Sequence, residues 1–72
     1  MKQLINEVEE SSGSVYRLFA EITDIPNPVG YKQLKFTSEW TGAKNPKLSH
    51  DKGHFFLSPE AFANLKNLVN AS

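Results

Sequence analysis

Aromatic and basic side chains are the residues of this sequence that are best suited to contact a ligand. Most aromatic residues fall in two segments of strand character, 15–24 and 31–40, and a lysine-rich stretch follows Trp40. Aromatic rings stack on nucleobases, and lysine and arginine neutralise phosphates. The same rings have a high strand propensity, so core packing is the alternative for each, and Trp40 can contact a base or cap the core under the loop.

Alternation along the strands decides which of these side chains share a face. Successive strand residues point to opposite sides. With a helix packed on the apolar residues of the two strands, the basic and aromatic residues between them point to the open side. The candidate nucleic-acid-binding residues are this group with Trp40 and the neighbouring lysines. They are Arg17, Phe19, Tyr31, Lys32, Lys35, Trp40, Lys44, Lys47 and Lys52.

The formal net charge of zero conceals two unlike segments. Residues 1–30 hold two basic and five acidic groups, whereas residues 31–57 hold five lysines and two acids. The central segment therefore has the positive charge that binding of a polyanion requires. The alternative interpretation is that these lysines are ordinary solvated surface residues. The acidic first third better fits a different class of function. In that hypothesis a small protein, for instance one encoded by a phage, docks on a host protein as an accessory or inhibitor.

No constellation in the sequence indicates catalysis. His50 and His54 flank Asp51, but no further cluster of ligands is visible, so we expect no metal. There is no Ser-His-Asp set and no glycine-rich phosphate loop before a helix. We therefore expect a non-enzyme without a cofactor. The absence of cysteine and of a long apolar run predicts a cytoplasmic protein with no membrane partner.

Local patterns predict the strands that position these residues. Alternation predicts strands at about 15–24 and 31–40, separated by a proline-containing loop, and a short apolar strand at about 53–57. Segment 2–10 is ambiguous, because its apolar residues fit one side of a short helix or a weakly alternating strand.

A helix is expected from about 59 to 70. Ser58 is a favourable N-cap, and Pro59 and Glu60 suit the first helical turn. Strands followed by one helix indicate an α+β domain with an antiparallel sheet. Because a 72-residue chain without cysteine has little core, its apolar helix stripe can bury against the sheet or across a two-fold interface. The stripe consists of Phe62, Leu65, Leu68 and Val69.

The second half of the chain resembles the single-stranded-DNA-binding transcriptional coactivator family, which has the positive-cofactor-four fold and includes bacterial and phage proteins. The resemblance runs from Tyr31 to about Asn70. It rests on Lys35-Phe36 leading to Trp40, on Lys52-Gly53, and on Leu57-Ser58-Pro59-Glu60-Ala61-Phe62 opening a helix with Leu65. The chain departs from the family pattern in a longer loop with Pro46 and in a less basic N-terminal half.

The resemblance implies a fold, a partner and an oligomeric state. The fold would be a four-stranded antiparallel meander followed by one C-terminal helix, in a single domain over residues 1–72. Segment 2–10 would then be a strand. The partner would be single-stranded DNA or RNA, bound with little sequence preference. The helix would help to form a homodimer.

Overall fold

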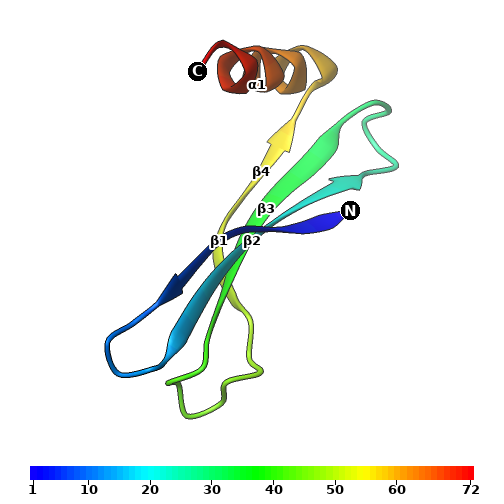
Figure 1. Ribbon diagram of the computed structural model, residues 1–72. Helices are drawn as coiled ribbons and strands as arrows, with labels where there is room; N and C mark the ends of the chain where they lie inside the picture. Colours follow the sequence, from blue (N-terminus) through cyan, green and yellow to red (C-terminus); the bar gives the residue numbers. More distant parts are fainter.

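The computed structural model describes residues 1–72 as one antiparallel sheet followed by one helix (Figure 1). The α+β fold predicted from the sequence is confirmed. The strands lie in the order β1-β2-β3-β4, so each strand pairs with its neighbour in the sequence. The elements are β1 (Lys2–Glu9), β2 (Val15–Asp24), β3 (Lys32–Trp40), β4 (His50–Leu57) and α1 (Pro59–Ala71).

The register of the strands defines two faces of the sheet. Tyr16 pairs with Trp40 across β2 and β3, whereas Arg17 pairs with Glu39 and points to the other side. We call the first side the apolar face and the second the charged face. The apolar face carries Tyr16, Leu18, Ala20, Ile22, Leu34, Phe36, Ser38 and Trp40.

The N-terminal segment forms β1, as the resemblance implies. Its register with β2 shifts between Leu4 and Asn6, which indicates a β-bulge at Ile5. As a result Leu4 lies on the charged face and Val8 on the apolar face. All residues of β1 are exposed, and the strand forms one open edge of the sheet.

The last strand begins earlier than the sequence predicts, at His50 instead of Gly53. The register between β3 and β4 shifts at this point, so Lys52 is an extra residue in a second bulge. Gly53 has a φ of 144°, which residues with a Cβ rarely adopt. Tyr31, which was expected inside the third strand, lies just before β3.

Ser58 connects β4 to α1 and caps the helix as predicted. Its Oγ accepts a hydrogen bond from the backbone N–H of Ala61 at 3.1 Å, and Pro59 follows in the first turn. The helix lies across one end of the sheet beside β4 and approaches the apolar face only near Ile22 (Figure 1). Most of the apolar face is therefore uncovered, unlike the arrangement expected from the sequence. The helix is too short and too polar to cross a membrane.

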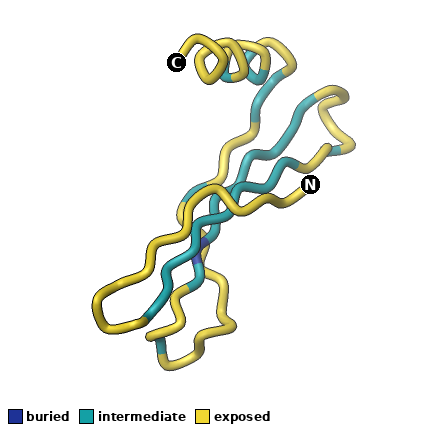
Figure 2. The backbone as a smooth tube through the Cα atoms, viewed as in Figure 1, coloured by how far each residue is buried: buried dark blue, intermediate teal, exposed yellow.

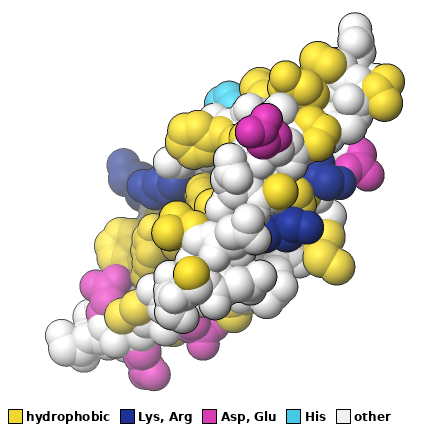
Figure 3. All heavy atoms as spheres, turned by 90° about the horizontal axis from the view of Figure 1, so that it is seen from above, with side chains coloured by type: hydrophobic (Ala, Val, Ile, Leu, Met, Phe, Trp, Pro, Cys, Tyr) yellow, Lys and Arg dark blue, Asp and Glu magenta, His cyan; other side chains and the backbone are white.

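Very little of the chain is buried. Ser38, at 3% exposure, is the one buried residue (Figure 2). The accessible surface is 5492 Å², whereas area scaling gives about 4,500 Å² for a compact monomer of this mass. The chain extends over 44 × 29 × 16 Å and is thus a thin layer. Seen from the helix end, many hydrophobic side chains reach the surface (Figure 3).

Candidate nucleic-acid interface

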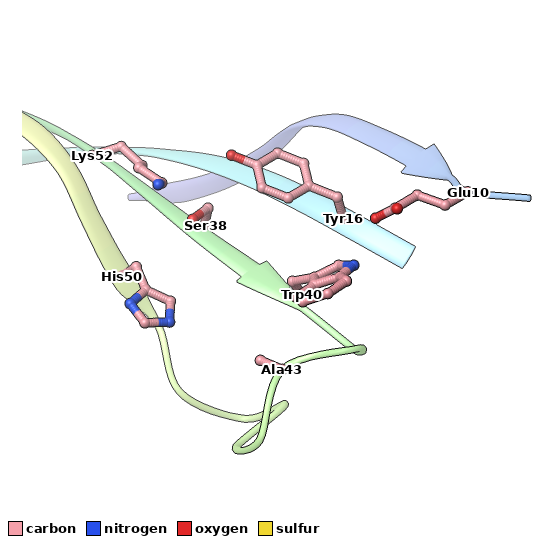
Figure 4. A pocket seen from close by; sticks show the side chains of 7 residues that line it. All are labelled: Glu10, Tyr16, Ser38, Trp40, Ala43, His50 and Lys52. Carbon is pink, nitrogen blue, oxygen red and sulfur yellow. The ribbon is translucent and has the colours of Figure 1, made fainter. Parts of the chain in front are cut away.

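A pocket of about 350 Å³ lies on the apolar face, at the end of the sheet away from α1 (Figures 1 and 4). This volume is within the usual range for small-ligand sites. Its aromatic side chains are Tyr16 on β2 and Trp40 on β3, and Ser38 lies on β3 beside them. The pocket is lined by Glu10, Tyr16, Ser38, Trp40, Ala43, His50 and Lys52.

Trp40 is held at the end of β3 by two hydrogen bonds between the next residue, Thr41, and Val15 of β2. The N–H of Thr41 donates to the carbonyl of Val15 at 3.0 Å, and the Thr41 hydroxyl accepts from the N–H of Val15 at 2.8 Å. The indole lies close to the backbone of Gly42, where a Cβ atom would be 2.5 Å from Cζ2 of Trp40. Trp40 is nevertheless 39% exposed, so its ring can stack on a ligand.

This close approach predicts the effect of Gly42→Ala. The added methyl group overlaps the indole, so we expect the Trp40 ring to move and its fluorescence emission to shift. Overpacking of this kind costs about 1–3 kcal/mol, which urea denaturation can measure. Asn45→Ala, in the same loop, is the matched control and should leave the emission unchanged. An unchanged spectrum in Gly42→Ala would show that the glycine does not fix the ring.

The bulge in β4 brings a cation to the pocket. Lys52 is the extra residue of the bulge, and its side chain lies beside the Tyr16 ring in Figure 4. The three ion pairs of the chain involve other residues, so the ammonium group of Lys52 is free to meet a phosphate. Lys44 and Lys47 are exposed in the loop between Trp40 and β4. The structure thus places these three predicted lysines at the same end of the sheet as Trp40.

The charged face holds another part of the predicted set, away from the pocket. Arg17 donates to the carboxylate of Glu7 at 2.7 Å, and the Lys2 ammonium lies 4.7 Å from the centre of the Phe19 ring. Lys35 pairs across the strands with Glu21. Three cations and five carboxylates point to this side of the sheet. The charged face therefore has a net negative charge, which is unfavourable for a polyanion.

The remaining predicted residues lie at the helix end of the sheet. Lys32 forms an ion pair with Asp24, and its hydrogen bond and charge lower the pKa of that carboxyl below the usual value. Tyr31 immediately precedes Lys32. At about 3.3 Å per strand residue, Lys32 and Trp40 are roughly 26 Å apart. One pocket cannot include both ends, although one extended strand of nucleic acid can.

The two histidines do not form a metal centre. Asp51 accepts a hydrogen bond from the N–H of Gly53 at 2.8 Å and contacts Nδ1 of His54 at 3.0 Å. The Gly53 N–H is the main reason that the pKa of Asp51 is lowered, and His54 adds to this effect. His50 lines the pocket instead. The structure contains no group of three or more His, Cys, Asp or Glu side chains able to hold a metal ion.

Several pocket residues were not singled out from the sequence. Tyr16 alternates with the apolar residues of its strand, His50 stands out only as a possible metal ligand, and no pattern marks Glu10 or Ser38. The sequence does contain one signal for Tyr16. If the segments 15–24 and 31–40 form a hairpin with Pro28 at its midpoint, Tyr16 pairs with Trp40, as the structure shows. Glu10 directly follows β1 and His50 begins β4, so their positions depend on a turn and a loop whose geometry no periodic pattern encodes.

Comparison of the chain with protein-family models, with curated proteins and with solved structures gave no match.

Proposed function

We propose that the chain is a single-stranded nucleic-acid-binding module that acts as a dimer and has little overall sequence preference. The observation that supports this function best is the open aromatic pocket, in which Tyr16 and Trp40 are cross-strand neighbours on the same face beside an unpaired Lys52. Stacking on such rings tolerates any base, because every base has a π-face. Lys44 and Lys47 extend the basic surface along the adjoining loop.

Titration of a labelled oligo-dT of about 12 nucleotides tests the proposal. Three lysines at the pocket end of the sheet, Lys44, Lys47 and Lys52, release about two counterions when a single strand binds. The association constant should therefore fall about 16-fold between roughly 50 and 200 mM salt. Fluorescence anisotropy at the two salt concentrations measures the change. Failure to bind at about 50 μM protein in the lower salt would contradict the function, because stacking and charge should together exceed that affinity.

Lysine variants identify the surface that carries the charge. Lys52→Gln should weaken binding and reduce the slope of log K against log salt by about 0.7. Lys2→Gln, on the charged face, is the matched control and should leave the slope unchanged. Equal effects of the two variants would mean that the charge acts without a defined site.

Self-association is part of the proposal because the isolated chain exposes too much surface. The excess over a compact monomer is about 1,000 Å², and a stable interface buries about 800 Å² on each partner. Much of the exposed apolar surface is near α1, where Leu68 and Val69 are 66% and 64% exposed. Ile22, Phe62, Leu65 and Val69 also line a second hollow of about 300 Å³. A second copy seated there leaves the pocket at the other end of the sheet free.

A protein partner is the second candidate. The observation that favours it is the charged face, where carboxylates outnumber cations and Phe56 is 60% exposed. A docking accessory or inhibitor would use this face or the open edge of β1. Recovery of the chain's partners from lysate with and without nuclease separates the two functions, since only nucleic-acid partners are lost on digestion.

A further inference from the structure

The pocket beside Trp40 has a carboxylate at one side and cations at the other. Figure 4 shows the Glu10 carboxylate turned toward Tyr16 and Trp40, whereas Lys52 and His50 lie on the far side of the Tyr16 ring. A nucleotide has a matching polarity, with a hydrogen-bonding base edge at one end and a phosphate at the other. A base stacked on Trp40 with its phosphate toward Lys52 directs its edge toward Glu10.

The backbone of Glu10 is fixed by the turn between β1 and β2. The N–H of Glu10 donates to the carbonyl of Ser14 at 2.8 Å, and the N–H of Gly13 donates to the carbonyl of Glu10 at 2.9 Å. The side chain has no partner, because the ion pairs and hydrogen bonds of the chain involve other carboxylates. The pocket therefore contains a carboxylate on a fixed backbone, with both oxygens available as acceptors.

Two adjacent acceptors select among the bases by their Watson–Crick edges. Guanine presents two neighbouring donors, its N1–H and its 2-amino group, which match the two oxygens of a carboxylate. Adenine, cytosine and thymine each place an acceptor next to their donor, which repels one of the oxygens. In single strands these edges are free to be read.

We infer that this pocket recognises a guanine nucleotide, with Glu10 as the specificity-determining acceptor and Lys52 beside the phosphate. The inference rests on the proposed function and deepens it. Most of a bound strand is held without regard to sequence, and one nucleotide per chain is read at the pocket.

Oligonucleotides of about 12 residues that differ at one central position test the inference. Wild-type protein should bind dT strands with a central dG about tenfold more tightly than all-dT strands. Central dA or dC should give no such gain. Deoxyinosine keeps N1–H but lacks the 2-amino group, so it should retain only about threefold. Glu10→Gln should reduce the dG-to-dT ratio to below about twofold, and the ratio is the relevant quantity because loss of a negative charge strengthens binding to every strand.

Glu9→Gln is the matched control. It removes the same charge one residue away, but Glu9 pairs with Val15 on the charged face, so the preference for dG should be unchanged. Equal binding of all strands by wild-type protein, with Trp40 still required, would overturn the guanine inference and leave the proposed function standing. A dG preference that survives in Glu10→Gln would overturn the role of Glu10.

Free dGMP distinguishes a mononucleotide site from a site on a strand. Weak binding of dGMP relative to the dG-containing strand supports recognition within a strand. Binding of dGMP that depends on Glu10, without binding of any oligonucleotide, would keep the guanine site but contradict the proposed function. If neither dGMP nor any strand binds, both are wrong.

Discussion

Replacement of Trp40 by alanine is expected to weaken binding of oligo-dT by roughly 5- to 150-fold. The indole is an exposed aromatic surface in the pocket, and stacking of a base on such a ring contributes about 1–3 kcal/mol. The change should appear mainly in the dissociation rate, because the lysines that attract the strand are retained. Anisotropy titrations and stopped-flow dissociation of a labelled strand measure both quantities.

Phe56→Ala is the matched control for Trp40→Ala. Phe56 is also an exposed aromatic residue, but it pairs with Gln33 and lies on the charged face. Its loss should leave the affinity for oligo-dT within about twofold, since its ring does not line the pocket. Circular dichroism of both variants reports whether the sheet is intact. Equal losses in the two variants would place the binding surface elsewhere than in the pocket.

Replacement of Val69 by aspartate is expected to dissociate the proposed dimer. Val69 is 64% exposed in the isolated chain, so the carboxylate can remain hydrated in a monomer. In a dimer that covers α1, the same carboxylate would be buried without a partner, which is strongly unfavourable. A loss of about 2 kcal/mol, typical of an interface hot spot, raises the dimer dissociation constant roughly 30-fold. Sedimentation equilibrium over a range of concentrations measures the constant.

Asn67→Asp adds the same charge to the same helix. With 3.6 residues per turn, Asn67 lies on the side of α1 opposite to Phe62, so its substitution should leave the dimer constant unchanged. If wild-type protein sediments as a monomer at all concentrations, self-association is wrong. If Val69→Asp remains a dimer, the second copy covers another surface.

The sequence predicts the central elements of this fold well and the two edge strands poorly. β2 and β3 alternate without interruption, and α1 has a strong N-terminal signal at Ser58. β1 and β4 each contain a bulge, at Ile5 and at Lys52, and each bulge inserts one residue that reverses the alternation. For this reason Leu4 and Val8 lie on opposite faces of the sheet, and the pattern of segment 2–10 alone fits a short helix as well as a strand.

The candidate site depends on information that a local pattern does not contain. Trp40 and Lys52 can be selected from the sequence by residue type and by the lysine-rich loop. They lie beside Tyr16 and Glu10 only because of the register between β2 and β3, the bulge at Lys52 and the turn between β1 and β2. Arg17, Phe19 and Lys35 share a face as predicted, but acidic residues from neighbouring strands surround them there. A prediction based on residue types within single strands therefore overestimates the positive charge of the charged face.

Ser38 is the only buried residue, so a single copy of the chain gains little stability from burial. The amount of folded protein should therefore depend on how much of the chain is present. In the proposed dimer, assembly stabilises the folded chain, so the folded fraction rises with total concentration. Proteases act on the open form, which is enriched when the chain is scarce. A cell that halves its synthesis would therefore lose more than half of the functional protein. Turnover of this kind would turn an expression change into a larger change in the amount of functional protein.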